Sequence, residues 1–207
     1  ANAYDGMSRR EFLSRVGVAG VGLAGFAIAA TPVAGKVITT ATEGLSAADG
    51  TVSSGGFAVP IYAVRPAAPG KYPAVLVIPE VFGMHEHIKD VTRRFAREGF
   101  LAVTFEPYAR EGGVQHLPDL DAVRKVVDPV PDARVMADLD AIVDWVRKHP
   151  SAMADRVGMT GFCRGGMYTL LYAAHSSELK AAVPWYGQLR PALTPGAHYY
   201  GHMVSNG

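Results

Sequence analysis

One short stretch constrains the fold more than any other part of the sequence. In RVGMTGFCRGGMYTLLYAAH, an apolar run typical of a strand meets a helical pattern across the five residues from Gly161 to Gly165. The turn between them is so tight that small residues are needed two positions before and after its centre, Cys163. This geometry is that of a nucleophile elbow, in which the backbone N–H of the next residue, Arg164, points at a developing oxyanion. The N-terminus of the following helix is expected to favour a thiolate at Cys163.

Strands and helices alternate along the rest of the chain. Apolar runs predict buried strands, and a 3.6-residue period predicts helices between them. The expected strands cover 57–65, 72–80, 100–105, 156–162 and 181–187, and the expected helices cover 87–99, 131–149 and 164–175, with a short helical piece near Pro118. Pro60 marks the first of these strands as an edge strand. The order predicts an α/β fold, with a mostly parallel sheet covered by helices on both faces.

The first 35 residues are expected to lie outside this domain. Arg9 and Arg10 precede an uncharged run from Val16 to Ala30, which is too short and too rich in glycine and alanine for a confident membrane span. The pattern predicts a twin-arginine export signal over 1–35, hence an exported, periplasmic or extracellular protein without stable membrane association after signal removal. An uncleaved membrane anchor is the alternative. Residues 36–56 are interpreted as a linker, 57–195 as the domain and 196–207 as a tail.

Composition narrows the range of functions. At 49% hydrophobic residues the chain can bury a core, and its formal net charge of +1, without a basic run after residue 15, does not suggest a nucleic-acid partner. A single cysteine cannot form an internal disulfide. Such a cysteine is either a small buried hydrophobe or a reactive thiol.

The motif GFCRGG, with PEVFG upstream and PYAR between them, resembles the dienelactone hydrolase (carboxymethylenebutenolidase) family of α/β-hydrolases. The similarity covers about residues 55–195. It implies a hydrolase without a cofactor, in which Cys163 opens a small lactone or ester and carries the acyl group as a thioester. It also implies that Glu80 contacts the resting thiol and helps to generate the thiolate when substrate arrives. A simple carboxylate near the next helix start is the alternative for Glu80.

The same resemblance assigns three further groups. The backbone N–H groups of Val81 and Arg164 are expected to form the oxyanion hole. Arg110, in the YAR position, is expected to hold a substrate carboxylate, which suits the fork of a guanidinium group. An exposed loop arginine is the alternative for Arg110. The HEH sequence at 85–87 is interpreted as polar surface at a helix start, so no metal site is predicted, because residues i and i+2 do not share a helix face.

The family pattern places an aspartate and a histidine after the nucleophile. No aspartate follows Cys163, and only His198 and His202 remain near the end. The chain is therefore expected to lack the last strands and helices of the fold, and to expose the edge of its final strand to self-association. The alternative function is that of an impaired hydrolase acting as a binding or interaction protein. A single-thiol redox protein is a weaker option, because a redox site does not need this strained turn.

Overall fold

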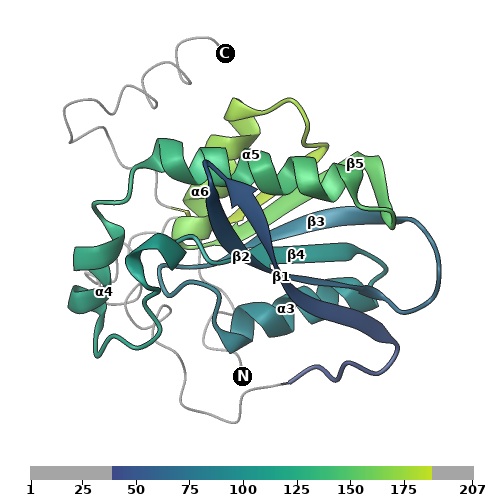
Figure 1. Cartoon of the computed structure of the whole chain (residues 1–207), viewed down its shortest axis with the longest axis horizontal. Coiled ribbons are helices and arrows are strands. Elements are labelled where there is room, and N and C mark those ends of the chain that lie inside the picture. Colours follow the sequence, from purple (N-terminus) through teal and green to yellow (C-terminus); the bar gives the residue numbers. More distant parts are fainter. Residues whose placement is uncertain (1–38, 188–207) are drawn as a thin grey trace, which may run out of the picture. The chain divides into compact units, whose positions relative to one another are not determined.

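The computed structural model describes residues 39–187, so the predicted export signal, the tail and both late histidines lie outside the described residues. The described part of the chain forms one six-stranded sheet with strand order β1-β2-β4-β3-β5-β6 (Figure 1). The strands are β1 (Leu45–Ser54), β2 (Phe57–Pro66), β3 (Tyr72–Ile78), β4 (Leu101–Phe105), β5 (Ala152–Phe162) and β6 (Ala181–Trp185). Strands β3 to β6 run parallel, which confirms the predicted parallel core, while β1 and β2 add an antiparallel hairpin at one side.

Two predictions about the hairpin are wrong. Residues 45–54, assigned to a linker, form β1 and pair with β2 along their whole length. Most of β1 is exposed, and its sequence has no alternating hydrophobic pattern that would predict a strand. Its conformation depends instead on pairing with β2. The strand β2 is not an edge strand, because β1 pairs with its outer side. Pro60 lies opposite Thr51 of β1, and the carbonyl of Pro60 accepts a hydrogen bond from the N–H of Glu106 at 2.9 Å.

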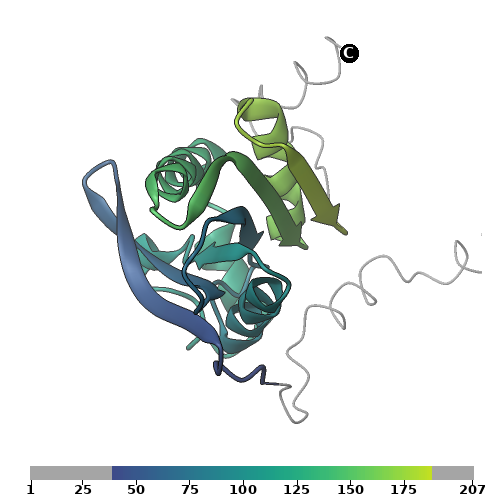
Figure 2. The ribbon, with the colours of Figure 1, turned by 90° about the vertical axis from the view of Figure 1, so that its right-hand side faces the viewer.

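Helices cover both faces of the sheet, as the alternating pattern predicts (Figures 1 and 2). Helix α3 packs against β2 and β4 on one face, whereas α5 and α6 pack against β5 and against each other on the opposite face. The helical segments are α3 (Glu86–Arg97), η1 (Ala109–Glu111), α4 (Leu120–Val127), α5 (Asp132–Lys148) and α6 (Arg164–His175). The short helix expected near Pro118 is α4. No helix within residues 39–187 has the length and apolar character needed to cross a membrane.

The central strands position the candidate site. The apolar run of β3 is buried from Ala74 to Ile78, and all five residues of β4 are buried. Because β3, β4 and β5 are parallel, the residues that follow them meet at the same edge of the sheet, where ligands bind in such folds. Glu106 and Cys163 come directly after β4 and β5, and Glu80 lies two residues after the end of β3.

Candidate active site

The predicted elbow is confirmed as a turn between β5 and α6. Cys163 lies between the two elements with φ 55° and ψ −119°, a conformation that costs free energy for a residue with a side chain. A Cβ atom on Gly161 would lie 2.2 Å from the carbonyl oxygen of Gly165, and one on Gly165 would lie 2.3 Å from that of Ile78. The backbones therefore approach too closely for any residue larger than glycine at these positions.

The thiol of Cys163 is buried, with 2% of the residue exposed. The backbone N–H groups of Arg164 and Val81 face its sulfur. Burial raises the pKa of the Cys163 thiol above its ordinary value, and the nearby charge of Glu80 raises the pKa further, whereas the two N–H groups lower it. The N–H of Arg164 at the start of α6 lowers the thiol pKa, as expected, but desolvation outweighs this effect, so the net direction is upward.

The segment that follows β3 brings Glu80 and Val81 to the elbow. Its turn is closed by a hydrogen bond from the N–H of Gly83 to the carbonyl of Glu80, at 3.2 Å. Glu80 is largely buried, and its carboxylate Oε2 lies 3.2 Å from Nε2 of His85. The structure thus brings four predicted groups together: the Cys163 thiol, the Glu80 carboxylate and the N–H groups of Val81 and Arg164.

His85 is a member of this cluster that the sequence interpretation missed. HEH was judged only as a metal motif or as polar surface, but His85 precedes α3 as its N-cap and faces back toward Glu80. Its ring stacks on that of His87, with centroids 6.1 Å apart. The spacing of five residues between a carboxylate after a buried strand and a histidine at a helix start was the available signal.

A second buried carboxylate also went unnoticed. Glu106 follows β4 with 8% of the residue exposed, and its Oε2 accepts hydrogen bonds from the N–H of Met84, at 2.8 Å, and from the amide of Gln115. Its Oε1 accepts from the N–H of Tyr108 at 3.1 Å. The available signal was an acidic residue directly after a buried strand, which is the same pattern as at Glu80.

The side chains of the two predicted arginines point to other partners. The guanidinium of Arg164 donates to Asp128 at 2.8 Å and to the hydroxyl of Tyr168 at 3.1 Å, so it acts on the thiol through its positive charge, which lowers the thiol pKa. The guanidinium of Arg110 forms a bidentate pair with the fully buried Asp138, at 2.6 and 2.8 Å, and lies over the ring of Phe57. Hydrogen bonding to Asp138 raises the pKa of Arg110.

The loop after β6 packs against the elbow. The N–H of Cys163 donates to the carbonyl of Trp185 at 3.0 Å, and a Cβ atom on Gly187 would lie 2.4 Å from the nitrogen of Met167. Between these contacts Tyr186 has φ 41°; it and Cys163 are the non-glycine residues with positive φ in the described range. Burial raises the pKa of Tyr186, and the charges of Glu80 and Cys163 raise it further.

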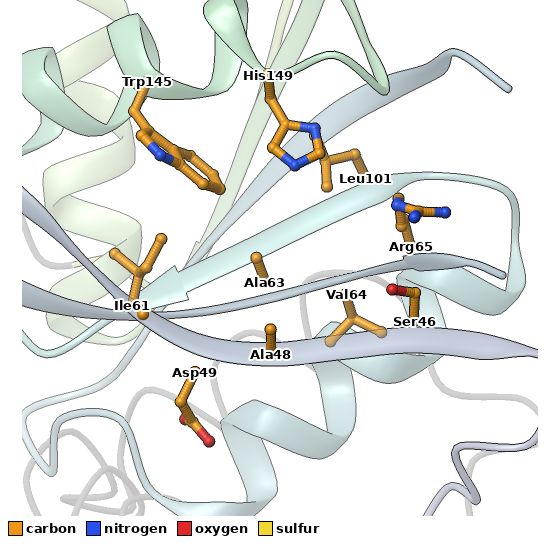
Figure 3. Close-up of a pocket in the computed structure, with 11 residues that line it drawn as sticks. Ser46, Ala48, Asp49, Ile61, Ala63, Val64, Arg65, Leu101, Trp145 and His149 are labelled. Atoms are coloured by element: carbon orange, nitrogen blue, oxygen red, sulfur yellow. The ribbon is translucent and has the colours of Figure 1, made fainter. Parts of the chain in front are cut away.

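A separate pocket of about 170 Å³ lies away from this chemistry (Figure 3). Trp145 and His149 extend from the end of α5 over Ile61 and Ala63 of the hairpin, with Leu101 at the start of β4 also lining the space. Leu101 begins β4 and His149 follows the last residue of α5, so this part of the pocket lies toward the amino ends of the parallel strands, whereas Cys163 lies at a carboxyl end. The pocket includes none of the predicted site residues, and we do not assign it to the reaction.

Comparison with known proteins identifies one family of relatives. Residues 59–199 match the model of the dienelactone hydrolase family. A relative from Methylorubrum extorquens, named "Putative carboxymethylenebutenolidase", is 47% identical over 186 residues, which cover 88% of this chain and 64% of that protein. A protein of the same name from Escherichia coli K12 is 43% identical over 167 residues, which cover 80% of this chain and 61% of that protein.

A solved structure supports the same relationship. The crystal structure titled "Putative Dienelactone Hydrolase" from Klebsiella pneumoniae is 45% identical and superposes with a TM-score of 0.68, over 71% of this chain and 62% of that one. This chain thus spans less than two thirds of the length of these relatives. With a family model matched over most of its length, and with an elbow built as that fold requires, the chain belongs to the dienelactone hydrolase family.

Proposed function

We propose that the protein hydrolyses a small lactone or ester through a thioester on Cys163. The observation that carries this proposal is the convergence of the N–H groups of Val81 and Arg164 on one buried sulfur. Donors fixed in this way stabilise the negative charge that develops on a carbonyl oxygen during acyl transfer. Once the sulfur moves toward a substrate carbon, the same donors are free to bind that oxygen.

The proposed reaction has two steps. The thiolate of Cys163 attacks the carbonyl carbon, a C–S bond forms, and the C–O bond to the alcohol breaks as that alcohol takes up a proton. Water then attacks the thioester carbon, releases the carboxylic acid and returns the sulfur to the thiol form. For a lactone, the alcohol and the acid remain parts of one product.

Glu80 is proposed to accept the thiol proton. In the resting site the pKa of Cys163 is raised by burial first and also by the charge of Glu80, so the sulfur is protonated and weakly nucleophilic. A substrate that changes the surroundings of Glu80 can make the carboxylate a better acceptor than it is at rest. This arrangement would restrict thiolate formation to the time when an acyl group is available.

From the N-terminal sequence we also propose that the protein is exported.

Arg110 remains our candidate ligand for a substrate carboxylate. The guanidinium of Arg110 already forms a bidentate pair with Asp138. A substrate carboxylate could bind Arg110 only by displacing Asp138 or by adding to this pair. We therefore expect Arg110 to discriminate weakly between charged and neutral esters unless Asp138 releases it.

Acylation of the thiol is the direct test. Incubation of the wild-type protein with p-nitrophenyl acetate is expected to add one acetyl group to the peptide that contains Cys163, with a matching burst of p-nitrophenolate. Since Cys163 is the chain's single cysteine, thiol labelling is unambiguous. Cys163→Ala should lose the acetylated peptide and reduce ester hydrolysis by roughly a thousandfold or more. Undiminished hydrolysis in Cys163→Ala would show that another residue is the nucleophile.

A further inference from the structure

Glu106 is a buried carboxylate with no counter-cation among the described residues. Its 8% exposure removes it from water, and the salt bridges found in residues 39–187 do not include it. Burial of a carboxylate is costly unless hydrogen bonds replace its hydration. Here three N–H donors replace it, and each donor comes from a different segment: the turn after β3, the loop after β4 and the segment that carries Gln115.

One of these segments also carries the oxyanion donor. The N–H of Gly83 closes a turn onto the carbonyl of Glu80, and Val81 lies inside that turn. The next N–H along the chain, from Met84, donates to Glu106. The carboxylate of Glu106 therefore holds the far end of the turn whose near end supplies the Val81 N–H to the sulfur.

Glycine at position 83 makes this attachment possible. Gly83 has φ 68°, and a Cβ atom there would lie 2.5 Å from both carboxylate oxygens of Glu106 and 2.7 Å from the amide nitrogen of Gln115. The turn thus lies directly on the carboxylate, without an intervening side chain. This contact leaves the turn little freedom to shift relative to the end of β4.

We propose that Glu106 is a positioning residue that fixes the Val81 N–H in the oxyanion hole. The proposal rests on the proposed thioester chemistry and specifies which step depends on Glu106. Acylation by an ester needs the oxyanion donors, because negative charge develops on the carbonyl oxygen. Alkylation by iodoacetamide develops no such charge and needs only the thiolate, so the two reactions separate the oxyanion hole from the thiol.

Glu106→Gln provides the test because it keeps the shape and removes the charge. Only one oxygen remains to accept, and the new NH₂ group must face at least one N–H donor. We expect acylation by p-nitrophenyl acetate to fall by about 10- to 100-fold, less than the loss of a whole oxyanion donor. The rate constant for alkylation of the Cys163 thiolate by iodoacetamide should stay within about twofold, because no oxyanion forms. It is taken from the high-pH limit of a pH profile, because the Val81 N–H also lowers the pKa of the thiol.

Two further variants keep the test decisive. Gln115→Met removes one donor and retains the carboxylate, so it should lower acylation less than Glu106→Gln and again spare alkylation. Glu111→Gln is the matched control, because Glu111 follows the same strand but pairs with Arg134, and it should change neither rate. Parallel loss of both rates, or no loss of acylation, in Glu106→Gln and Gln115→Met would overturn the proposal. A wild-type protein that is alkylated but never acylated at Cys163 would instead overturn the proposed function.

Discussion

At the scale of single residues, Cys163 is subject to opposing influences. Burial and the charge of Glu80 raise the pKa of its thiol, whereas the N–H groups of Arg164 and Val81 lower it. The net direction is upward, which favours the thiol over the thiolate. In the proposed mechanism, the N–H groups therefore serve mainly to bind an oxyanion, and Glu80 determines when the sulfur becomes nucleophilic.

Glu80→Gln is expected to affect alkylation and acylation in opposite directions. Without the negative charge, the pKa of Cys163 falls, so more thiolate is present at pH 8 and iodoacetamide should react about two- to tenfold faster, the effect of a shift of up to one pKa unit. Acylation should slow, because the proton acceptor is lost. Rates measured from pH 6 to 10, with Glu86→Gln as control because Glu86 pairs with Arg93, provide the check. An unchanged alkylation profile would contradict the placement of Glu80.

At the scale of elements, the junction of β5 with α6 depends on glycine. Gly165→Ala would bring its Cβ to 2.3 Å from the carbonyl oxygen of Ile78 and 2.5 Å from that of Pro79, both backbone atoms that cannot rotate away. We expect the free energy of unfolding, measured in urea, to fall by about 3 kcal/mol, at the upper end for overpacking. Gly50→Ala is the matched control, because its nearest neighbour would be 3.8 Å away, and it should change stability by less than about 0.5 kcal/mol. Equal stability of the two variants would argue against the close approach.

The same elements show what the sequence could and could not predict. Local patterns sufficed for the elbow, for β3 and for α5, because glycine spacing and hydrophobic period act within a few residues. They failed for β1, whose conformation comes from its partner strand.

Long-range contacts were the other obstacle. The attachment of Glu106 to Met84 joins residues 22 positions apart, and the pairing of Arg110 with Asp138 joins residues 28 positions apart. The net direction of the Cys163 pKa could not be predicted for a related reason: a helix N-terminus can be read from the sequence, but the extent of burial that outweighs it cannot.

At the scale of the whole described domain, the candidate active site and a histidine with a lowered pKa lie toward opposite ends of the parallel strands. The carboxyl edge carries Cys163, while His149 lies toward the opposite edge in the pocket below Trp145. Burial lowers the pKa of His149, and the positive charge of Arg65 lowers it further. The N–H of Ser151 donates to Nδ1 of His149 at 3.2 Å, which requires that nitrogen to be unprotonated. The folded protein therefore favours neutral His149.

This preference sets the sign of a pH effect on stability. Because the folded pKa lies below the unfolded value of about 6.5, the unfolded chain binds the proton more readily, and stability falls as pH drops from about 6.5 toward the folded pKa. Urea unfolding at pH 7.5, 6.5, 5.5 and 5.0 should show this loss in the wild type and a smaller loss in His149→Gln. Arg65→Gln should also reduce the loss, since removing the nearby positive charge raises the folded pKa. The same acid dependence in all three proteins would show that His149 stays equally accessible to protons in the folded and unfolded states.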